Sequence, residues 1–540
     1  MAAAASSGAI VSAQSLPAGG QQAQDTTARF NTWLENRFDG WVARSPMRQG
    51  YLGLRTSMDK WDNLSEAHLA ENVERARREL SDPHKNFGPS SLNAEGKVSY
   101  KLYEYESEQR IESHRWRYHG YPVNQNFGWQ QNIPSFLINI HRVNGEADAH
   151  AYVARLRSVG DLIDQVIYWM RVGQEADVLA PQFVYGVVLR DCRNVIAGAP
   201  FAGEGESPLW TDFSRKVAAL DISETTKTDL MNGARYALLN VVGPAYKNLI
   251  VACEEQQRLA TTDDGVWKLP EGEAYYAYML RQHTTTDISA DEIHAFGMED
   301  VNRIHGEMRD IMKAVGFSGD LKEFFSYLKS DPSFFYPQNE SGRSAYLART
   351  REVIEEVRAR LDQMFLSAPR APLDVKAVEA YREQSATTAF YQGPGAFDGR
   401  PGTYYVNLFD MQAMPKYEIE SLAYHEALPG HHMQIALAQE IPELPSFRRF
   451  SSRYTAYVEG WGLYCEQLPK EMGLYDDPYS DFGRLSAELW RACRLVVDTG
   501  IHSASRRWSR EKAIQYLRDN TPNSERDVTN SIERYIVQPG

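Results

Sequence analysis

The chain has 540 residues, of which 43% are hydrophobic and 24% are charged, and its formal net charge is −14 at pH 7. This composition is typical of a globular protein that is long enough for one large core or two lobes. The acidic balance argues against nucleic acid as a partner, and no apolar run approaches the roughly 18 residues of a membrane-spanning helix.

The amino-terminal segment has a composition of its own. Residues 1–24 are rich in Ala, Ser, Gly and Gln, which predicts no packed structure. Val11-Ser12-Ala13 resembles the small-residue end of a signal peptide, although a basic region before it is missing. We therefore expect residues 1–27 to be disordered or to be the remainder of an export signal. This favours a periplasmic or secreted protein over a cytoplasmic one.

From about residue 28 the spacing of apolar residues indicates helices almost throughout. Ser289 and Glu292 have the spacing of a capping box, which predicts a helix that runs to Val315. We therefore predict a mainly α fold, with a helical lobe over residues 28–290 and a second helical lobe over residues 291–540. The clearest of the other periodic segments are 30–42, 67–80, 149–171 and 209–247.

The helical pattern is interrupted before the histidine-rich region. Residues 393–402 are dense in Gly and Pro and predict a loop, and β-branched and aromatic residues over 403–408 predict a strand. A strand here would belong to a small sheet, and it could equally offer an edge to an extended peptide. The glycine-rich loop is not followed by a phosphate-binding pattern.

The stretch from His425 to His432 holds three of the thirteen histidines, and Glu426 follows the first of them. Imidazoles are common zinc ligands, and a glutamate beside an activated water can act as its general base. On a straight helix neither His431 nor His432 could share a zinc ion with His425, because they lie on different faces or about 10.5 Å apart. A break at Pro429-Gly430 would remove this obstacle. The pattern does not decide which later histidine returns to His425.

A third ligand is predicted downstream. Glu459 lies on an apolar and aromatic helix after Pro442 and Pro445, which mark a turn between two helices. Gly460 and Gly462 would let that helix pack closely. Glu466 lies two turns further on the same face, so it is a rival ligand or a partner of a histidine ligand.

The carboxy-terminal helices offer donors for a developing oxyanion. Arg494 and His502 share roughly one helical face, and Tyr535 lies near the end of the chain. We expect one or more of these three side chains to act in catalysis. A purely structural network of salt bridges and hydrogen bonds is the alternative.

Several of these segments together resemble a bacterial family known as domain of unknown function 885, and the likeness spans about residues 28–540. Family members are regarded as zinc metallopeptidases, often exported. Their mostly helical fold is similar to that of the carboxypeptidase Taq and thimet-oligopeptidase group, with a deep central cleft and a small sheet beside the metal helix. The segments are 121–136, 283–294, 400–407, 425–434, 458–464, 494–502 and 533–540.

In that group the motif ends in Gly-His, so the resemblance implies that His431 is the second ligand and that His432 sits behind it. The interpretation is then a peptidase with one zinc ion per chain, held by His425, His431 and Glu459, that hydrolyses short peptides or small amide conjugates. Glu426 would be the general base. The alternatives are a metal-dependent hydrolase of non-peptide esters or amides, or a catalytically silent binding protein. The side chains expected to line the substrate are Tyr404, Tyr405 and Asn407.

Overall fold

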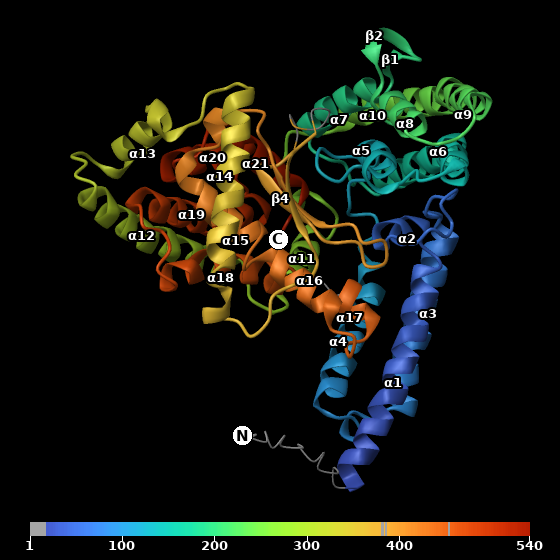
Figure 1. Cartoon of the computed structure of the whole chain (residues 1–540), viewed down its shortest axis with the longest axis horizontal. Coiled ribbons are helices and arrows are strands. Elements are labelled where there is room, and N and C mark those ends of the chain that lie inside the picture. Colours follow the sequence, from blue (N-terminus) through green and yellow to red (C-terminus); the bar gives the residue numbers. More distant parts are fainter. Residues whose placement is uncertain (1–17, 380–382, 384–385, 452–453) are drawn as a thin grey trace, which may run out of the picture.

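The computed structural model describes residues 18–379, 383, 386–451 and 454–540. The chain is mainly α-helical, as predicted, and the strands of the described residues form small sheets (Figure 1). Most of the segment that we expected to be disordered or exported, residues 1–17, lies outside the described residues. Helix α1 (Ala18–Val42) already begins within that segment, because its Ala and Gln residues have high helix propensity. Within the described part, no helix combines the length and apolar character needed to cross a bilayer.

The other helices of the amino-terminal half pack in two groups (Figure 1). The first, with α1, forms an elongated arm around a core that includes Phe30 and Tyr100. The second forms a bundle beneath the short strands β1 (Ala197–Ala199) and β2 (Ala202–Glu206). The arm contains α2 (Pro46–Leu52), α3 (Glu66–Asn86) and α4 (Ala94–Ser113), and the bundle contains α5 (Trp129–Ser135), α6 (Glu146–Glu175), α7 (Gln182–Val195), α8 (Pro208–Ala218), α9 (Glu224–Ala237) and α10 (Gly243–Leu259).

The carboxy-terminal half is a larger helical assembly. The predicted capping box is present: Ser289 accepts a hydrogen bond from the backbone of Glu292, and α12 starts there. Helix α12 packs along α19, and Gly297 permits this approach, because a Cβ there would lie 2.9 Å from Leu495 Cβ. The helices are α11 (Gly272–Thr284), α12 (Ala290–Ala314), α13 (Leu321–Ser330), α14 (Glu340–Arg358), α15 (Ile419–Glu426), α16 (His431–Glu440), α17 (Ser446–Phe450), α18 (Thr455–Glu471), α19 (Pro478–His502), α20 (Arg510–Asn520) and α21 (Glu525–Val537).

A small three-stranded sheet lies beside α15, and one of its strands packs against that helix. The strands are β3 (Leu373–Ala377), β4 (Ala389–Gln392) and β5 (Gly402–Val406), in the order β3-β5-β4. Strand β5 is parallel to β3 and antiparallel to β4. The expectation that the strand at 403–408 offers a free edge to a peptide is therefore wrong, because β5 is paired on both sides.

The arm is attached to the segments that flank α15 and α16. In the loop between β4 and β5, the backbone N–H of Phe397 donates to the carbonyl of Leu52 over 3.2 Å. At α17, the backbone N–H of Ser446 donates to Glu35 of α1 over 2.8 Å. Figure 1 shows α17 next to the arm. The two halves therefore touch near the centre of the molecule, and the predicted division near residue 290 stays a prediction.

One histidine of the amino-terminal half is buried without a negative partner. His141 is 2% exposed; its Nδ1 accepts a hydrogen bond from Arg155 over 2.9 Å, and its Nε2 donates to the carbonyl of Asp148 over 3.0 Å. Burial and the charge of Arg155 lower the pKa of His141 to about 3. The neutral ring is thus the form that the fold requires.

We expect this requirement to make the fold sensitive to acid. The pKa of His141 in the folded chain lies below the value of about 6.5 of an unfolded chain, so its contribution to stability is complete above that pH and is lost as pH falls toward 3. At pH 5 the loss is about 2 kcal/mol. Urea unfolding of His141→Gln should therefore show a smaller drop in the free energy of unfolding between pH 7 and pH 5 than the wild type. The exposed His150→Gln is the control, and identical drops in all three proteins would contradict the assignment.

Candidate metal centre

The chain reverses between α15 and α16, at the break predicted for Pro429-Gly430. Helix α15 ends at Glu426 and α16 begins at His431. The backbone of Gly430 lies so close to the end of α15 that a Cβ there would be 1.9 Å from the carbonyl oxygen of His425. Only glycine fits at this position. The reversal brings the rings of His425 and His431 to 4.6 Å between centroids.

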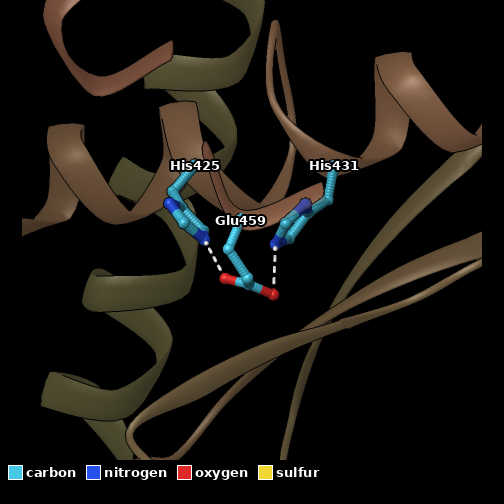
Figure 2. A group of neighbouring side chains, drawn as sticks. All are labelled: His425, His431 and Glu459. Atoms are coloured by element: carbon cyan, nitrogen blue, oxygen red, sulfur yellow. Dashed lines mark ion pairs between the residues drawn. The ribbon is translucent and has the colours of Figure 1, made fainter. Parts of the chain in front are cut away.

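Glu459 of α18 meets these two rings. His425 Nε2 lies 3.6 Å from Glu459 Oε2, and His431 Nε2 lies 3.7 Å from Glu459 Oε1. Figure 2 shows both imidazoles directed toward this carboxylate. One donor atom from each residue lies within 4.8 Å of the others, and 55% of the Glu459 side chain is exposed. The structure therefore brings together the three side chains that we predicted as ligands, at a point that solvent can reach.

The separations suit a shared cation. Zinc bonds of about 2.1 Å in a tetrahedral site place ligand atoms about 3.4 Å apart, whereas a hydrogen bond would close to about 2.9 Å. The observed nitrogen-to-oxygen distances of 3.6 and 3.7 Å are closer to the separation of two ligands of one metal ion than to a hydrogen bond. Two imidazoles and one carboxylate are also the donor set of catalytic zinc sites that keep a position for water. The three residues fit the metal, and their binding of zinc stays a prediction.

Glu466 and Arg491 support His425 from the other side. Glu466 is 2% exposed, and its Oε1 lies 2.8 Å from His425 Nδ1 and 2.7 Å from Arg491 Nη2. A carboxylate only accepts hydrogen bonds, so Nδ1 carries a proton, and Nε2 is the nitrogen that would bind a metal in place of its own proton. Glu466 therefore has the position of a partner of a histidine ligand, and Glu459 has the position of a ligand.

The electrostatics of the cluster favour the binding of a cation. Burial and Arg491 lower the pKa of His425, but the carboxylates of Glu459 and Glu466 outweigh them and raise it to about 9. Burial raises the pKa of Glu459, but His425 and His431 outweigh it and lower the pKa to about 2. Several carboxylates thus act on one pair of imidazoles, which is the condition for holding a cation.

Glu426 is buried next to the same cluster. Burial raises its pKa to about 7, partly opposed by the charge of His425 and reinforced by that of Glu459. A carboxyl group with a pKa near neutrality can both accept and return a proton. This is the property required of the general base that we predicted at this position.

His432 points away from the cluster. It is fully buried, its Nδ1 lies 2.8 Å from the hydroxyl of Tyr391, and its Nε2 lies 3.1 Å from the carbonyl oxygen of Ala371. The Nε2–H donates to the carbonyl, so Nδ1 accepts from the tyrosine. Both nitrogens are thereby occupied, and of the two later histidines it is His431 that faces His425.

The predicted oxyanion donors differ in their surroundings. Arg494 lies 4.6 Å from the ring centroid of Tyr535, whose side chain is buried. His502 is 0% exposed, with Nδ1 bonded to the backbone N–H of Val266 over 3.2 Å and Nε2 to the carbonyl of Tyr535 over 3.0 Å. No ring nitrogen of His502 is left for a substrate, so this histidine joins backbone segments instead.

The predicted substrate-lining residues are mostly engaged within the protein. Tyr404 is fully buried in a hydrophobic cluster. Tyr405 stacks on Phe390 at 4.9 Å between centroids. Asn407 Nδ2 donates to the carbonyls of Glu383 and Ala386 over 2.9 and 3.0 Å. Their contact with a substrate stays a prediction.

Two features near the cluster were not predicted. Arg491 was missed, although its spacing of three residues from Arg494 places both on one helical face. A pocket of about 520 Å³ lies beside Glu466 and Gly460, lined with charged side chains that include Arg303 and Glu488. The deep central cleft implied by the family resemblance stays a prediction.

Comparison with known proteins identifies the family. Residues 46–540 match the family described as bacterial protein of unknown function, DUF885. The chain belongs to this family. Among curated proteins, none matches the sequence.

Solved structures share the fold of this DUF885 protein. A candidate lipoprotein from Colwellia psychrerythraea has 28% sequence identity and a TM-score of 0.87, over 95% of this chain and 90% of the other. A candidate lipoprotein of unknown function from Shewanella oneidensis has 16% identity and a TM-score of 0.67, with the same coverage of 95% and 90%. The fold is therefore similar to that of these two proteins.

The two neighbouring histidines allow a matched test of metal binding. His431→Ala should lose most of the bound zinc, because Nε2 of His431 faces the shared point and two ligands rarely retain the metal. His432→Ala should keep it, because that ring is bonded elsewhere. Zinc content per chain, measured by elemental analysis after dialysis, checks both. Loss of zinc in His432→Ala alone would show that the assignment of the two histidines is reversed.

Two glycines of α18 provide a second matched pair. A Cβ at Gly462 would lie 2.5 Å from Cε1 of His425, whereas a Cβ at Gly460 would meet nothing within 4 Å. Our prediction of close packing is thus confirmed at Gly462 and wrong at Gly460.

Gly462→Ala should displace the imidazole and weaken zinc binding at least tenfold, with little change at Gly460→Ala. Competition with a zinc chelator measures the affinities, and both variants replace glycine by alanine in one helix. Equal affinities in the two variants would show that α18 does not set the position of His425.

Proposed function

We propose that this DUF885 protein is a zinc-dependent metallopeptidase that hydrolyses short peptides or small amide conjugates. The observation that carries the proposal is the convergence of His425, His431 and Glu459 on one accessible point, with Glu426 directly after the first histidine. When bound, one zinc ion per chain would bring the pKa of a water molecule to about 7 and polarise the substrate carbonyl.

The chain's own residues then have distinct tasks. Glu466 accepts a hydrogen bond from Nδ1–H of His425 and fixes the orientation of that ring. Glu426 takes a proton from the attacking water and delivers it to the nitrogen of the leaving amine. Of the predicted oxyanion donors, the half-buried Arg494 remains able to reach a substrate, whereas Tyr535 is buried and both ring nitrogens of His502 are occupied.

The proposal extends to the cellular location. The two similar structures are described as candidate lipoproteins, which are proteins of the cell envelope. Together with the small-residue pattern near Ala13, this supports a periplasmic or secreted peptidase.

Replacement of the general base tests the proposal directly. Glu426→Gln should keep zinc, because Glu426 is not one of the converging ligands, and should lower turnover by about 10²–10⁴-fold. Peptide hydrolysis and zinc content are measured on the same preparation, with the exposed Glu471→Gln as control. Full activity in Glu426→Gln would remove the general-base role.

A substrate panel separates a peptidase from other hydrolases. Dipeptides, acylated amino acids and esters are assayed with the zinc-loaded wild type. Hydrolysis of peptides and acylated amino acids supports the proposal. Hydrolysis of esters alone would favour the non-peptide alternative, and zinc binding without turnover of any compound would favour a binding protein.

A further inference from the structure

Two arginines flank the ring of Tyr535. The guanidinium carbon of Arg494 in α19 lies 4.6 Å from the ring centroid, and that of Arg534 in α21 lies 5.2 Å from it. Both arginines are half-buried. Within the part of the chain that the structure describes, neither forms an ion pair with a carboxylate. Half-buried arginines without a carboxylate are costly, because the charge is desolvated without compensation.

The side chain of Tyr535 itself is buried between α19 and α21. The side chain is 1% exposed, and its hydroxyl lies near Arg534 and Ser531 but makes no hydrogen bond of normal geometry. Burial raises the pKa of Tyr535, but the charges of Arg534 and Arg494 outweigh it and lower the pKa. Two guanidinium groups thus gather at one ring, and among the residues that the structure describes no carboxylate pairs with either of them.

Two helices connect this cluster to the predicted metal ligands. On α19, Arg494 follows Arg491 by one helical turn, and Arg491 contacts Glu466. On α18, Thr455 precedes Glu459 by one turn, and its hydroxyl lies 3.1 Å from Nδ1 of His283.

His283 connects the two helices. Burial lowers the pKa of His283; the charge of Asp498 opposes this effect and the charge of Arg494 adds to it, so both charged groups of α19 act on the histidine that contacts α18. Thr455 and Glu459 are both exposed, so a ligand can reach this face of α18. The two arginines therefore lie beyond the metal residues: Arg494 is one helical turn further than Arg491, and the contact of Thr455 with His283 lies between Glu459 and Arg494.

The nearby acidic group does not neutralise the cluster. Asp498 accepts hydrogen bonds from the hydroxyl of Tyr276 over 2.6 Å and from the backbone N–H of Gly540 over 3.1 Å. It forms no ion pair with Arg494, although the two are four residues apart on one helix. Its charge is directed toward these other donors, so the guanidinium of Arg494 keeps donors for a ligand.

We propose that Arg494 and Arg534, held by the ring of Tyr535, bind the C-terminal carboxylate of the substrate. An extended peptide advances roughly 3.3–3.6 Å per residue, so this carboxylate lies a few residues beyond the bond that is cleaved. The substrates are then short peptides with a free C-terminus. The location of the scissile bond rests on the proposed function, whereas the binding of the carboxylate does not.

Binding to a variant without turnover tests the site. In the zinc-loaded Glu426→Gln protein, N-acetyl-trialanine should bind at least tenfold more tightly than its C-terminal amide, because bidentate pairing of arginine with a carboxylate is lost in the amide. Arg494→Gln and Arg534→Gln, each added to Glu426→Gln, should remove this preference. Titration calorimetry measures the affinities, and thermal unfolding confirms that each variant is folded.

A third peptide distinguishes recognition of a C-terminal carboxylate from recognition of a side-chain carboxylate. N-acetyl-Ala-Ala-Glu-amide carries its carboxylate on a side chain, and it should bind like the trialanine amide. Arg518→Gln removes an arginine that pairs with Glu525 on the surface, and it should leave all three affinities unchanged.

The outcomes separate this inference from the peptidase proposal. Equal binding of the acid and the amide, or no binding of either, would overturn the carboxylate site. Preferred binding of the side-chain carboxylate, or equal loss of acid and amide binding in Arg494→Gln, would also overturn it. Preference for the free acid without hydrolysis by the wild type would keep the carboxylate site and remove the peptidase.

Discussion

The arrangement of the candidate centre depends on the contact between Gly430 and the last turn of α15. A helix that continued through this point would separate His425 from His431, and a side chain on residue 430 would collide with the carbonyl oxygens of Tyr424 and His425. The indole nitrogen of Trp461 donates to the carbonyl of Pro429 over 3.0 Å, so α18 is hydrogen-bonded to the chain reversal between α15 and α16. One backbone approach therefore sets both the pairing of the imidazoles and the position of the helix that carries Glu459.

Charge compensation also contributes to the arrangement of the candidate centre. Glu466 is almost fully buried, and its charge is balanced by Arg491 on one side and by the Nδ1 proton of His425 on the other. A buried carboxylate with only one of these partners would be costly. Since the residues come from α15, α18 and α19, the electrostatic requirement also holds these three helices in register. The rigidity of the ring of His425 thus has its origin in residues that do not face the shared point.

Local signals in the sequence predicted the features that depend on neighbouring residues. The capping box at Ser289, the break at Pro429-Gly430 and the helical character of most segments follow from backbone chemistry within a few positions. The choice of Glu459 over Glu466 could not be made in this way. Both lie on one face of α18, and only the packing of α15 decides which of them meets Nε2 and which meets Nδ1.

Other misses have the same cause. The sequence pattern at 403–408 fits an edge strand and a middle strand equally well. Its place between β3 and β4 is decided by residues distant in sequence. His502 resembles a catalytic donor on its helical face, yet the backbone of Val266 occupies its Nδ1. Arg491 was overlooked because its role depends on Glu466, 25 residues away on another helix. Pairing between distant segments is not encoded in any short window of sequence.

The attachment of α17 to the arm has a mechanical consequence. Helix α17 connects α16, which carries His431, to α18, which carries Glu459, and Glu35 holds it from a distance of 411 positions in the chain. Glu95 of α4 also pairs with this helix, through Arg448 over 3.0 Å. The amino-terminal half supplies none of the three converging side chains, yet it braces the connector between two of them. Loosening the arm, by a proteolytic cut or by repacking of its core, would thus alter the span between imidazole and carboxylate from afar.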